Sequence, residues 1–303
     1  MQVAAAETRG RLVAGVFRDG GRPVGLGTAR LHRTVGVVDV DHIANGALCG
    51  LGLAGGLPGP LHPDGHPDQA MLAAAVQAFE AALRREFGRW ARAVAYRQIY
   101  ARDLPVVVRG ATVAREGAPV AVLDTRVAGY DEYLRRLPAR RRSDQRRLRR
   151  RIDGDPGLDV YEGPAATSGL GVDELYPLAE GTARRNRARS WPRPPIRSRL
   201  WVAAMLRLAC TEVVAYRDWD GRLVGAALAH DHPVGPALGS WGALPPGPGR
   251  RSGLWFDTHG RHIQRFIERG RPVLIGGKGH VQAKTVLGFE AVPQWTVLRR
   301  LRV

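Results

Sequence analysis

The 303-residue chain has few cysteines and no long apolar segment, and each shortage excludes a class of protein. Its only cysteines, Cys49 and Cys210, are too few for a disulfide framework or a cysteine-ligated metal cluster, which indicates a reducing compartment. No apolar run approaches the length of a transmembrane helix, and Glu7 and Arg9 follow the short alanine run where a signal peptide would stay apolar. We therefore expect a cytoplasmic protein that neither crosses nor anchors to a membrane.

Lysine is nearly absent as well. Of the 46 basic residues only Lys278 and Lys284 are lysines, and both lie in one glycine-rich segment, residues 275–289. Codon preference alone can produce an arginine bias, but lysine differs from arginine as a compact, mobile charge that titrates. The pair is therefore a candidate for chemistry that arginine does not perform. The alternative is a surface turn followed by a helix.

Positive charge, by contrast, is abundant and uneven. The net charge is +18, of which residues 1–125 carry +3 and residues 126–303 carry +15. Residues 140–151 contain eight arginines against one acid, Asp144, and residues 184–199 contain seven more. Charge concentrated in this way attracts polyanions, above all nucleic acid, so we expect an RNA partner. A basic face that only solvates the protein is the alternative.

The sequence also repeats itself weakly. Residues 17–25 resemble residues 216–225, and each copy has the pattern of a β-hairpin with a tight Asp/Gly turn. Each hairpin precedes a strand (46–53; 237–244), a Gly/Pro-rich loop, a helix (68–87; 252–269) and a further strand (92–99; 272–275). We therefore predict an α+β (mixed α/β) fold with two similar lobes, residues 1–125 and 126–303, a division that suits the length of the chain.

Further helices and one strand are expected at the start of the second lobe. Residues 130–138 predict a short helix that ends before proline, and the arginine-rich segment predicts a second helix that ends at Gly154. A strand at 158–162 and helices at 172–189 and 197–210 follow.

Several of these segments, in this order, resemble a known family. They are Tyr130-Asp-Glu-Tyr-Leu-x-x-Leu-Pro138 with its arginine-rich helix, the second hairpin, the helix at 252–270, and Gly276-Gly-Lys-x5-Lys284-x3-Gly288-Phe289. Together they resemble the Fem-type aminoacyltransferases of the GNAT acyltransferase superfamily. The resemblance implies two GNAT-like lobes, each a mixed, mostly antiparallel sheet flanked by helices. It also implies aminoacyl-tRNA as the acyl donor, with no bound cofactor and no covalent nucleophile.

One departure bears on the choice of donor. Members that use acetyl-CoA hold its pyrophosphate with Arg/Gln-x-x-Gly-x-Gly/Ala, because small residues let backbone N–H groups approach closely. Here the segment from Arg250 ends in Trp255 where a small residue is needed, and the first lobe offers Asp64 and Asp68, whose carboxylates repel phosphate. Acetyl-CoA or another acyl-CoA is therefore disfavoured. An acyl-CoA-dependent N-acyltransferase and a non-catalytic RNA-binding protein remain the alternatives.

Candidate site residues follow from the resemblance and from their chemistry. Lys284 matches the lysine before the closing Gly-Phe and would steady an oxyanion or a terminal phosphate, while Lys278 is the second choice. The amine's proton could pass to Asp257, His259 or His230, although a first-turn acid and a core histidine are equally ordinary roles. Trp241 and Trp255 are candidates for stacking on the terminal adenine, or for the core. The expected tRNA contacts are Arg140, Arg141, Arg142, Arg146, Arg147, Arg150, Arg184, Arg185, Arg187, Arg250, Arg251 and Lys278.

The acceptor and any metal are the least constrained. His62 and His66 have a metal-like spacing, but prolines flank them and no third ligand is apparent, so we predict no metal site. We expect the enzyme to form an amide bond on the amine of a small molecule, as in natural product biosynthesis, or of a peptide.

Overall fold

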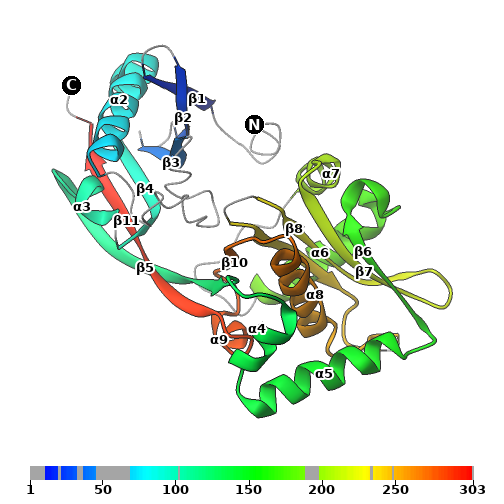
Figure 1. Cartoon of the computed structure of the whole chain (residues 1–303). Helices are drawn as coiled ribbons and strands as arrows, with labels where there is room; N and C mark the ends of the chain where they lie inside the picture. Colours follow the sequence, from blue (N-terminus) through cyan, green and yellow to red (C-terminus); the bar gives the residue numbers. More distant parts are fainter. Residues whose placement is uncertain are drawn as a thin grey trace. The chain divides into compact units, whose positions relative to one another are not determined.

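The computed structural model divides the chain into two compact units. The structure describes residues 11–19, 22–32, 37–45, 69–101, 103–187, 198–232, 235–247 and 249–301. The N-terminal unit holds residues 8–123, 275–285 and 289–303, and the central unit holds residues 124–274 and 286–288 together with 1–7. Figure 1 labels the elements of both units, and each unit is described by itself.

The N-terminal unit is a mixed sheet with one long helix. Its strands follow the order β1-β2-β3-β4-β11-β5, in which only the β3–β4 pair is parallel among the described strands. The elements are β1 (Arg11–Asp19), β2 (Arg22–His32), β3 (Val37–Asn45), α2 (Gln69–Phe87), the 3-10 turn η1 (Gly88–Trp90), β4 (Ala93–Tyr100), α3 (Leu104–Val107), β5 (Ala111–Asp124), α9 (Val281–Thr285) and β11 (Glu290–Arg300). The division between the units passes through β10 (Val273–Gly277).

Helix α2 covers this sheet because its apolar residues recur at helical spacing. Val76, Phe79 and Leu83 are buried in one cluster with Val94 and Ile99 of β4. One polar pair lies inside this core, where the Tyr96 hydroxyl donates to Glu80 Oε1 at 2.7 Å. Burial, the nearby Glu80 carboxylate and this hydrogen bond raise the pKa of Tyr96 well above its usual value.

The central unit is an antiparallel sheet with helices on both faces. Strands β6, β7, β8 and β9 pair in sequence order. The elements are α4 (Tyr130–Arg136), α5 (Ala139–Asp153), β6 (Leu158–Pro164), the 3-10 turn η2 (Ala165–Thr167), α6 (Val172–Arg187), α7 (Arg199–Arg207), β7 (Thr211–Asp218), β8 (Leu223–His230), β9 (Ala237–Ala243) and α8 (Leu254–Glu268).

Strand β7 shows why both faces of this sheet are covered. Its side chains alternate between the two sides of the sheet, as the strand geometry requires. Val213 and Ala215 join the cluster beneath α6 and α7, whereas Val214 and Tyr216 join the cluster that includes Leu254 at the start of α8. All four residues are buried, so β7 reads as a continuous apolar run and not as an alternating one.

The predicted fold class is confirmed. Each predicted copy of the repeat contains a hairpin (β1–β2; β7–β8), a third strand (β3; β9), a main helix (α2; α8) and a further strand (β4; β10). In the first copy the third strand is β3, whereas the expected strand at 46–53 lies outside the described residues. The proposed lobes and the compact units differ in residues 275–285 and 289–303, which belong to the N-terminal unit. The second of these segments contains β11, which pairs with β4 and β5.

No helix within the described part of the chain is long and apolar enough to span a bilayer.

Candidate nucleic-acid interface

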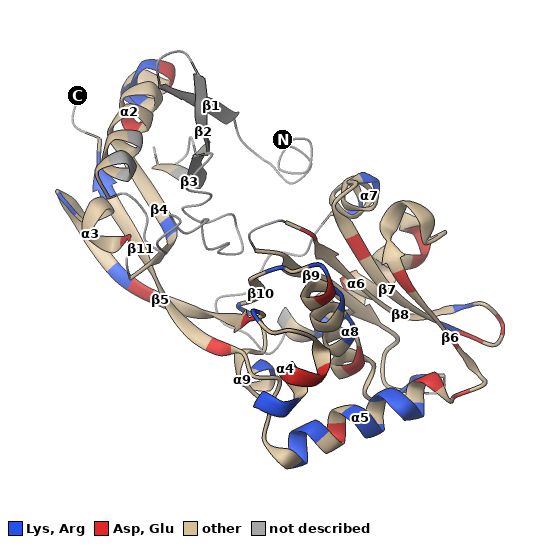
Figure 2. Cartoon of the chain, in the orientation of Figure 1, with Lys and Arg blue, Asp and Glu red and all other residues tan. Residues whose placement is uncertain are grey.

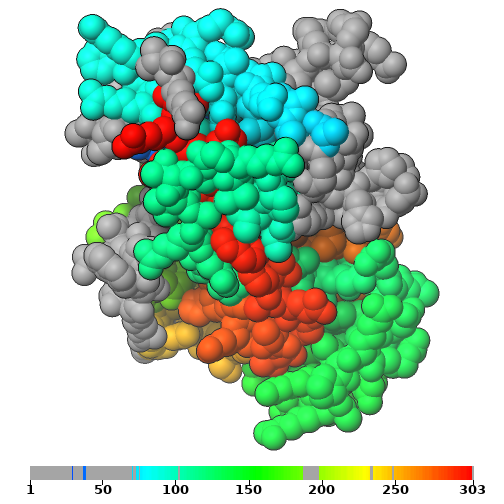
Figure 3. All heavy atoms as spheres, turned by 90° about the vertical axis from the view of Figure 1, so that its left-hand side faces the viewer, coloured from blue at the N-terminus to red at the C-terminus, as the bar shows by residue number. Residues whose placement is uncertain are grey.

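Helix α5 carries an arginine-rich surface on the central unit. Its inner side is fixed by Ile152, which is buried, and by Leu148, which packs against the same cluster as Tyr216. Basic residues recur along the whole of α5, as Figure 2 shows. Part of this stretch of the chain lies at the surface in the space-filling view of Figure 3. Arg140, Arg141 and Arg150 are exposed, and no described residue forms an ion pair or hydrogen bond with their side chains.

The neighbouring arginines have only weak partners. Arg146 meets Asp131 at 3.1 Å and Arg147 meets Asp144 at 2.9 Å, and in both pairs the arginine side chain is more than half exposed. Exposed pairs of this kind contribute roughly 0–1 kcal/mol, and a guanidinium has five N–H donors. Donors therefore remain for phosphate oxygens along this side of α5.

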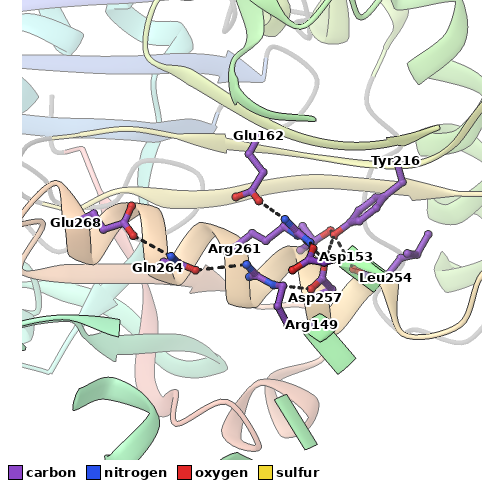
Figure 4. A network of polar contacts seen from close by, with 10 residues as sticks. Arg149, Asp153, Glu162, Tyr216, Leu254, Asp257, Arg261, Gln264 and Glu268 are labelled. Carbon is purple, nitrogen blue, oxygen red and sulfur yellow. Dashed lines mark hydrogen bonds and ion pairs between the residues drawn. The ribbon is translucent and has the colours of Figure 1, made fainter. Parts of the chain in front are cut away.

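Arg149 points the other way, into a buried network. Its Nε donates to Asp257 Oδ1 at 2.9 Å, and Asp257 is only 2% exposed (Figure 4). The other carboxylate oxygen of Asp257 accepts from Arg261 Nε at 2.6 Å and from the Tyr216 hydroxyl at 2.8 Å. This carboxylate therefore joins α5, α8 and β7. Its contacts favour the structural role over that of proton acceptor.

Arg261 is the second centre of the network. Only 5% exposed, it also pairs with Asp153 at the end of α5 and with Glu162 on β6. Burial by itself lowers the pKa of Arg261, but Asp257 and Glu162 outweigh it and raise the pKa above its usual value. The positive charge of the buried Arg261 guanidinium is therefore balanced by three carboxylates, those of Asp257, Asp153 and Glu162.

Further along α8 the same pattern recurs at one-turn intervals. Arg265 binds Glu212 at 2.5 Å, and Arg269 binds both Glu212 at 2.8 Å and Asp231 at 2.5 Å. Arg271 completes a bidentate pair with Asp231, through Nε at 2.7 Å and a terminal nitrogen at 2.9 Å. Burial alone would raise the pKa of Asp231, but the hydrogen bonds from Arg271 and Arg269, together with the charges of these two arginines, have a larger, opposite effect. The pKa of Asp231 is therefore below its usual value. These arginines are committed to the fold.

Glycines let α5 approach the start of α8. A Cβ at Gly253 would stand 2.6 Å from Leu148 Cδ1 and 2.9 Å from Arg151, and its φ of +85° is one that other residues rarely adopt. Further along α8, a Cβ at Gly260 would stand 3.1 Å from the Tyr130 hydroxyl of α4 and 3.4 Å from Gln145 of α5. Arg151 also donates to the carbonyl of Ser252 at 2.9 Å. The N-terminus of α8 is therefore covered by α5.

A cavity of about 290 Å³ lies beside the contact between α5 and the start of α8, which we call the α5–α8 seam. Three arginines and one acid give its wall a net positive charge, and one glutamine and three apolar residues complete it. The lining residues are Arg141, Asp144, Gln145, Arg147, Leu148, Arg151, Phe256 and Val286. Of these, only Arg141 and Arg147 were predicted to be site residues. Phe256 was missed because it reads as a core residue beside Leu254.

The lysine pair lies in the N-terminal unit. Lys284, in α9, is 6% exposed, and its Nζ donates to the carbonyl of Gly279 at 2.5 Å. Burial lowers the pKa of Lys284 to about 8 and also lowers that of the half-buried Lys278. Lys284 is thus protonated at neutral pH but closer to titration than an exposed lysine.

The predicted histidines have different surroundings. His259 is buried, with Nδ1 2.8 Å from the carbonyl of Trp255 and its ring 4.0 Å from the Trp255 ring. His230 is half-buried at the end of β8. His262, which was not predicted, is 1% exposed, and neither ring nitrogen has a hydrogen-bond partner among the described residues. Burial, with a smaller effect of Arg265, lowers its pKa to about 3.

The predicted stacking residues are both partly buried. Trp241 packs against the cluster that contains Val224 and Leu254, which favours the core alternative for this side chain. Trp255 makes a T-shaped contact with Phe256, the ring centroids 4.8 Å apart.

The remaining basic candidates differ in exposure and in their partners. Arg184 is exposed and pairs with Glu180, whereas Arg185 donates to the carbonyl of Ala243 at 3.0 Å. Arg187 ends α6, Arg250 is exposed, and Arg251 lies 3.4 Å from Asp155. Arg142 donates to the carbonyl of Arg135 at 3.4 Å.

No metal site emerges from the described residues, since no group of three or more His, Cys, Asp and Glu side chains among them is placed to hold an ion. His62 and His66 lie outside the described residues.

Comparison with known proteins identifies the fold but no family. No model of a protein family matches the chain, and no curated protein matches it in sequence. Among solved structures, the chain is similar to the C-terminal domain of a putative lysylphosphatidylglycerol synthetase from Agrobacterium fabrum, with a TM-score of 0.62 and 16% identity over 99% of this chain and 87% of that one.

Two further structures have the same architecture. FemX matches with a TM-score of 0.61 and 10% identity, over 98% of this chain and 89% of that one. L-PGS from Bacillus licheniformis matches with a TM-score of 0.57 and 10% identity, over 96% of this chain and 85% of that one. The fold is thus that of FemX and L-PGS, and the predicted GNAT-type fold is confirmed.

Proposed function

We propose that the protein transfers an amino acid from aminoacyl-tRNA to the amine of a small molecule or peptide, and so forms an amide bond. The observation that carries the proposal is the exposed arginine side of α5, on which Arg140, Arg141 and Arg150 have no partner among the described residues. An RNA backbone is the polyanion that such a row of guanidinium groups suits. The shared fold with FemX supports the same class of reaction by analogy.

The start of α8 argues against an acyl-CoA donor. A pyrophosphate at a helix N-terminus needs open backbone N–H groups. Here Leu148 and Arg151 of α5 lie against Gly253, and the bulky Trp255 follows within the first turn. These contacts leave little room for a pyrophosphate. We propose that the reaction uses aminoacyl-tRNA as a co-substrate and needs no bound cofactor. We place the reaction in the cytoplasm.

The chemistry required is modest, because an ester of tRNA is already activated. The acceptor nitrogen attacks the ester carbonyl carbon, the bond to the ribose oxygen breaks, and the amine's proton leaves as the ribose oxygen gains one. We assign Lys284 to the negative charge that develops on the carbonyl oxygen. Its ammonium has three N–H donors, of which one is held by Gly279, so two remain.

The donor is tested by direct assay. Purified protein is offered radiolabelled aminoacyl-tRNA pools or acetyl-CoA, each with an amine-bearing extract. We expect label to reach an amide product only from aminoacyl-tRNA, and RNase treatment to abolish the transfer. Transfer that survives RNase and requires CoA would make the protein an acyl-CoA N-acyltransferase. RNA binding without turnover of any charged tRNA would make it an RNA-binding protein.

Lys284 is tested through pH. Lys284→Ala should lower turnover on the order of 10²-fold, the usual loss for one oxyanion donor. Only the protonated amine stabilises an anion, so wild-type turnover should fall as pH rises through about 8, the pKa that burial gives Lys284. Lys284→Arg keeps a charge that does not titrate in this range, so its pH profile should lose that fall. A wild-type pH profile in Lys284→Ala would exclude the assignment.

A further inference from the structure

The cavity beside the α5–α8 seam has the size of a small ligand site. Its volume of about 290 Å³ is at the lower end of the range of roughly 300–1,000 Å³ found for small-molecule pockets. That volume suits one compact chemical unit. It lies wholly within the central unit.

The charges in its wall favour an anionic group. Arg141, Arg147 and Arg151 face a single acid, Asp144. No described residue pairs with Arg141, and Arg147 is 77% exposed with one bond to Asp144. Arg151 already donates to Ser252. A guanidinium has five N–H donors, so Arg141 and Arg147 both have donors left for a phosphate, and Arg151 has some as well.

The remaining wall suits a flat, partly polar ring. Leu148, Phe256 and Val286 supply apolar surface, and Trp255 fixes the Phe256 ring in a T-shaped contact. Aromatic side chains of this kind stack on nucleic-acid bases. Gln145 offers both a donor and an acceptor, and Asp144 has a second carboxylate oxygen that can accept from the exocyclic amine of a base.

We propose that this cavity holds one unstacked nucleotide of a bound RNA, with its base against Phe256 and its phosphate on Arg141 and Arg147. The inference rests on the proposed function for the presence of RNA, but it makes a separate claim. The exposed arginines of the same helix, Arg140 and Arg150, continue the phosphate path outside the cavity. A base paired in a duplex cannot enter the cavity, so the site selects a single-stranded segment or end.

The site is tested with a short single-stranded RNA that carries 2-aminopurine, whose fluorescence falls when the base stacks on an aromatic ring. We expect saturating wild-type protein to quench the RNA probe, and a duplex with the 2-aminopurine paired to show no added quenching. Phe256→Leu keeps an apolar side chain but removes the aromatic ring. It should abolish the quenching and weaken binding about 5- to 140-fold, the range found for loss of base–aromatic stacking.

A matched pair of arginine variants separates the cavity from the rest of the helix. Arg141→Gln and Arg150→Gln each remove one α5 guanidinium that has no partner in the described residues, but only Arg141 lines the cavity. Both should lower the salt dependence of RNA binding by about one unit. Only Arg141→Gln should also weaken binding of cytidine 5′-monophosphate, which the wild type should prefer to uridine 5′-monophosphate because uracil lacks an exocyclic amine.

Thermal denaturation of each variant shows that it is folded. Quenching that is equal in wild type and Phe256→Leu would overturn the nucleotide site. So would displacement of the probe by an N-acetylated amino acid but not by cytidine 5′-monophosphate, since the cavity would then bind a carboxylate. Aminoacyl transfer is assayed separately, so a protein that transfers normally from tRNA without quenching the probe refutes this inference while the proposed function stands.

Discussion

In the central unit, the arginines of helix α5 and those in and just after helix α8 are used in opposite ways. The α8 arginines stand one turn apart, at 261 and 265 and then at 269 just past its end, and each meets a carboxylate from another part of the unit. On α5 only Arg149 turns inward to such a partner. The others are exposed, weakly paired or without a partner in the described residues. The number of arginines therefore does not measure the positive charge that a ligand meets.

The same lesson applies to the whole chain. Divided at residue 125, the sequence places +15 of its charge in the second part. The compact units divide it differently, because both lysines and three arginines near the C-terminus belong with the N-terminal unit. The central unit then has 27 basic and 18 acidic residues, and the N-terminal unit has 19 and 10, so each carries +9. What the charge count does not show is that several exposed arginines of the central unit lie on one helix, α5.

The largest expected effect lies on α8. Arg261→Met removes a buried guanidinium and leaves Asp257, Asp153 and Glu162 without it. Breaking a buried ion pair by removing one partner typically costs about 3–5 kcal/mol, so we expect a loss of that order in the free energy of unfolding. Urea denaturation measures it. Arg150→Met on α5 is the matched control and should stay within about 0.5 kcal/mol of wild type. Equal stabilities of the two variants would erase the contrast between the helices.

The converse test lies on α5. Reversing Arg146, Arg147 and Arg150 to Glu removes three phosphate contacts and adds repulsion, so RNA affinity should fall by roughly 10²- to 10³-fold. Folding stability should change little, because the only ion pairs lost are exposed ones. Filter binding across a salt series and thermal denaturation measure the two quantities. The corresponding Gln triple variant distinguishes loss of contact from repulsion. Unchanged affinity would mean that the α5 surface is only solvated.

The smallest effect at neutral pH concerns His262 of α8, whose buried ring nitrogens have no hydrogen-bond partner among the described residues. His262→Phe removes two unsatisfied nitrogens, so stability at pH 7 should change by about 1 kcal/mol or less. The pKa of about 3 in the folded state is below the usual 6.5, so the unfolded state binds the proton more readily between these values. Stability is therefore complete above about pH 6.5 and is lost as pH falls towards 3.

This difference gives the measurement for His262. Urea denaturation at pH 7 and at pH 4.5 should show a marked loss for the wild type and a smaller one for His262→Phe. Identical losses in the two proteins would mean that the imidazole is hydrated or paired in solution.

The fold could be predicted from the sequence because its signals are local. Helix α5 lies where the arginine-rich segment between Pro138 and Gly154 placed it, and β7 and β8 follow the hairpin predicted at 216–225. Helix α8 spans residues 254–268 where 252–269 was expected, since its apolar residues recur at helical spacing.

The candidate site could be predicted only in part, because pairing is a property of distant residues. Arg149 pairs with Asp257, which is 108 positions away, and no residue near Arg149 in the sequence predicts this contact. Arg261 pairs with Glu162 at a separation of 99 positions. An inward arginine and an outward one therefore look alike in the sequence. Phe256 and Val286 likewise meet in one cavity wall with no local signal. The roles of Lys284, His230 and the α5 arginines remain predictions.

Strand β11 has a consequence for how the chain reaches this fold. It lies between β4 and β5, whose own residues are complete by position 124, yet β11 itself begins only at residue 290. During synthesis, β4 and β5 each lack the strand that pairs with one of their edges until β11 is made, which takes more than half of the chain. Open edges of this kind pair readily with other chains. We therefore expect the N-terminal unit to acquire its native stability last, although it is translated first, and chains halted before residue 290 to aggregate.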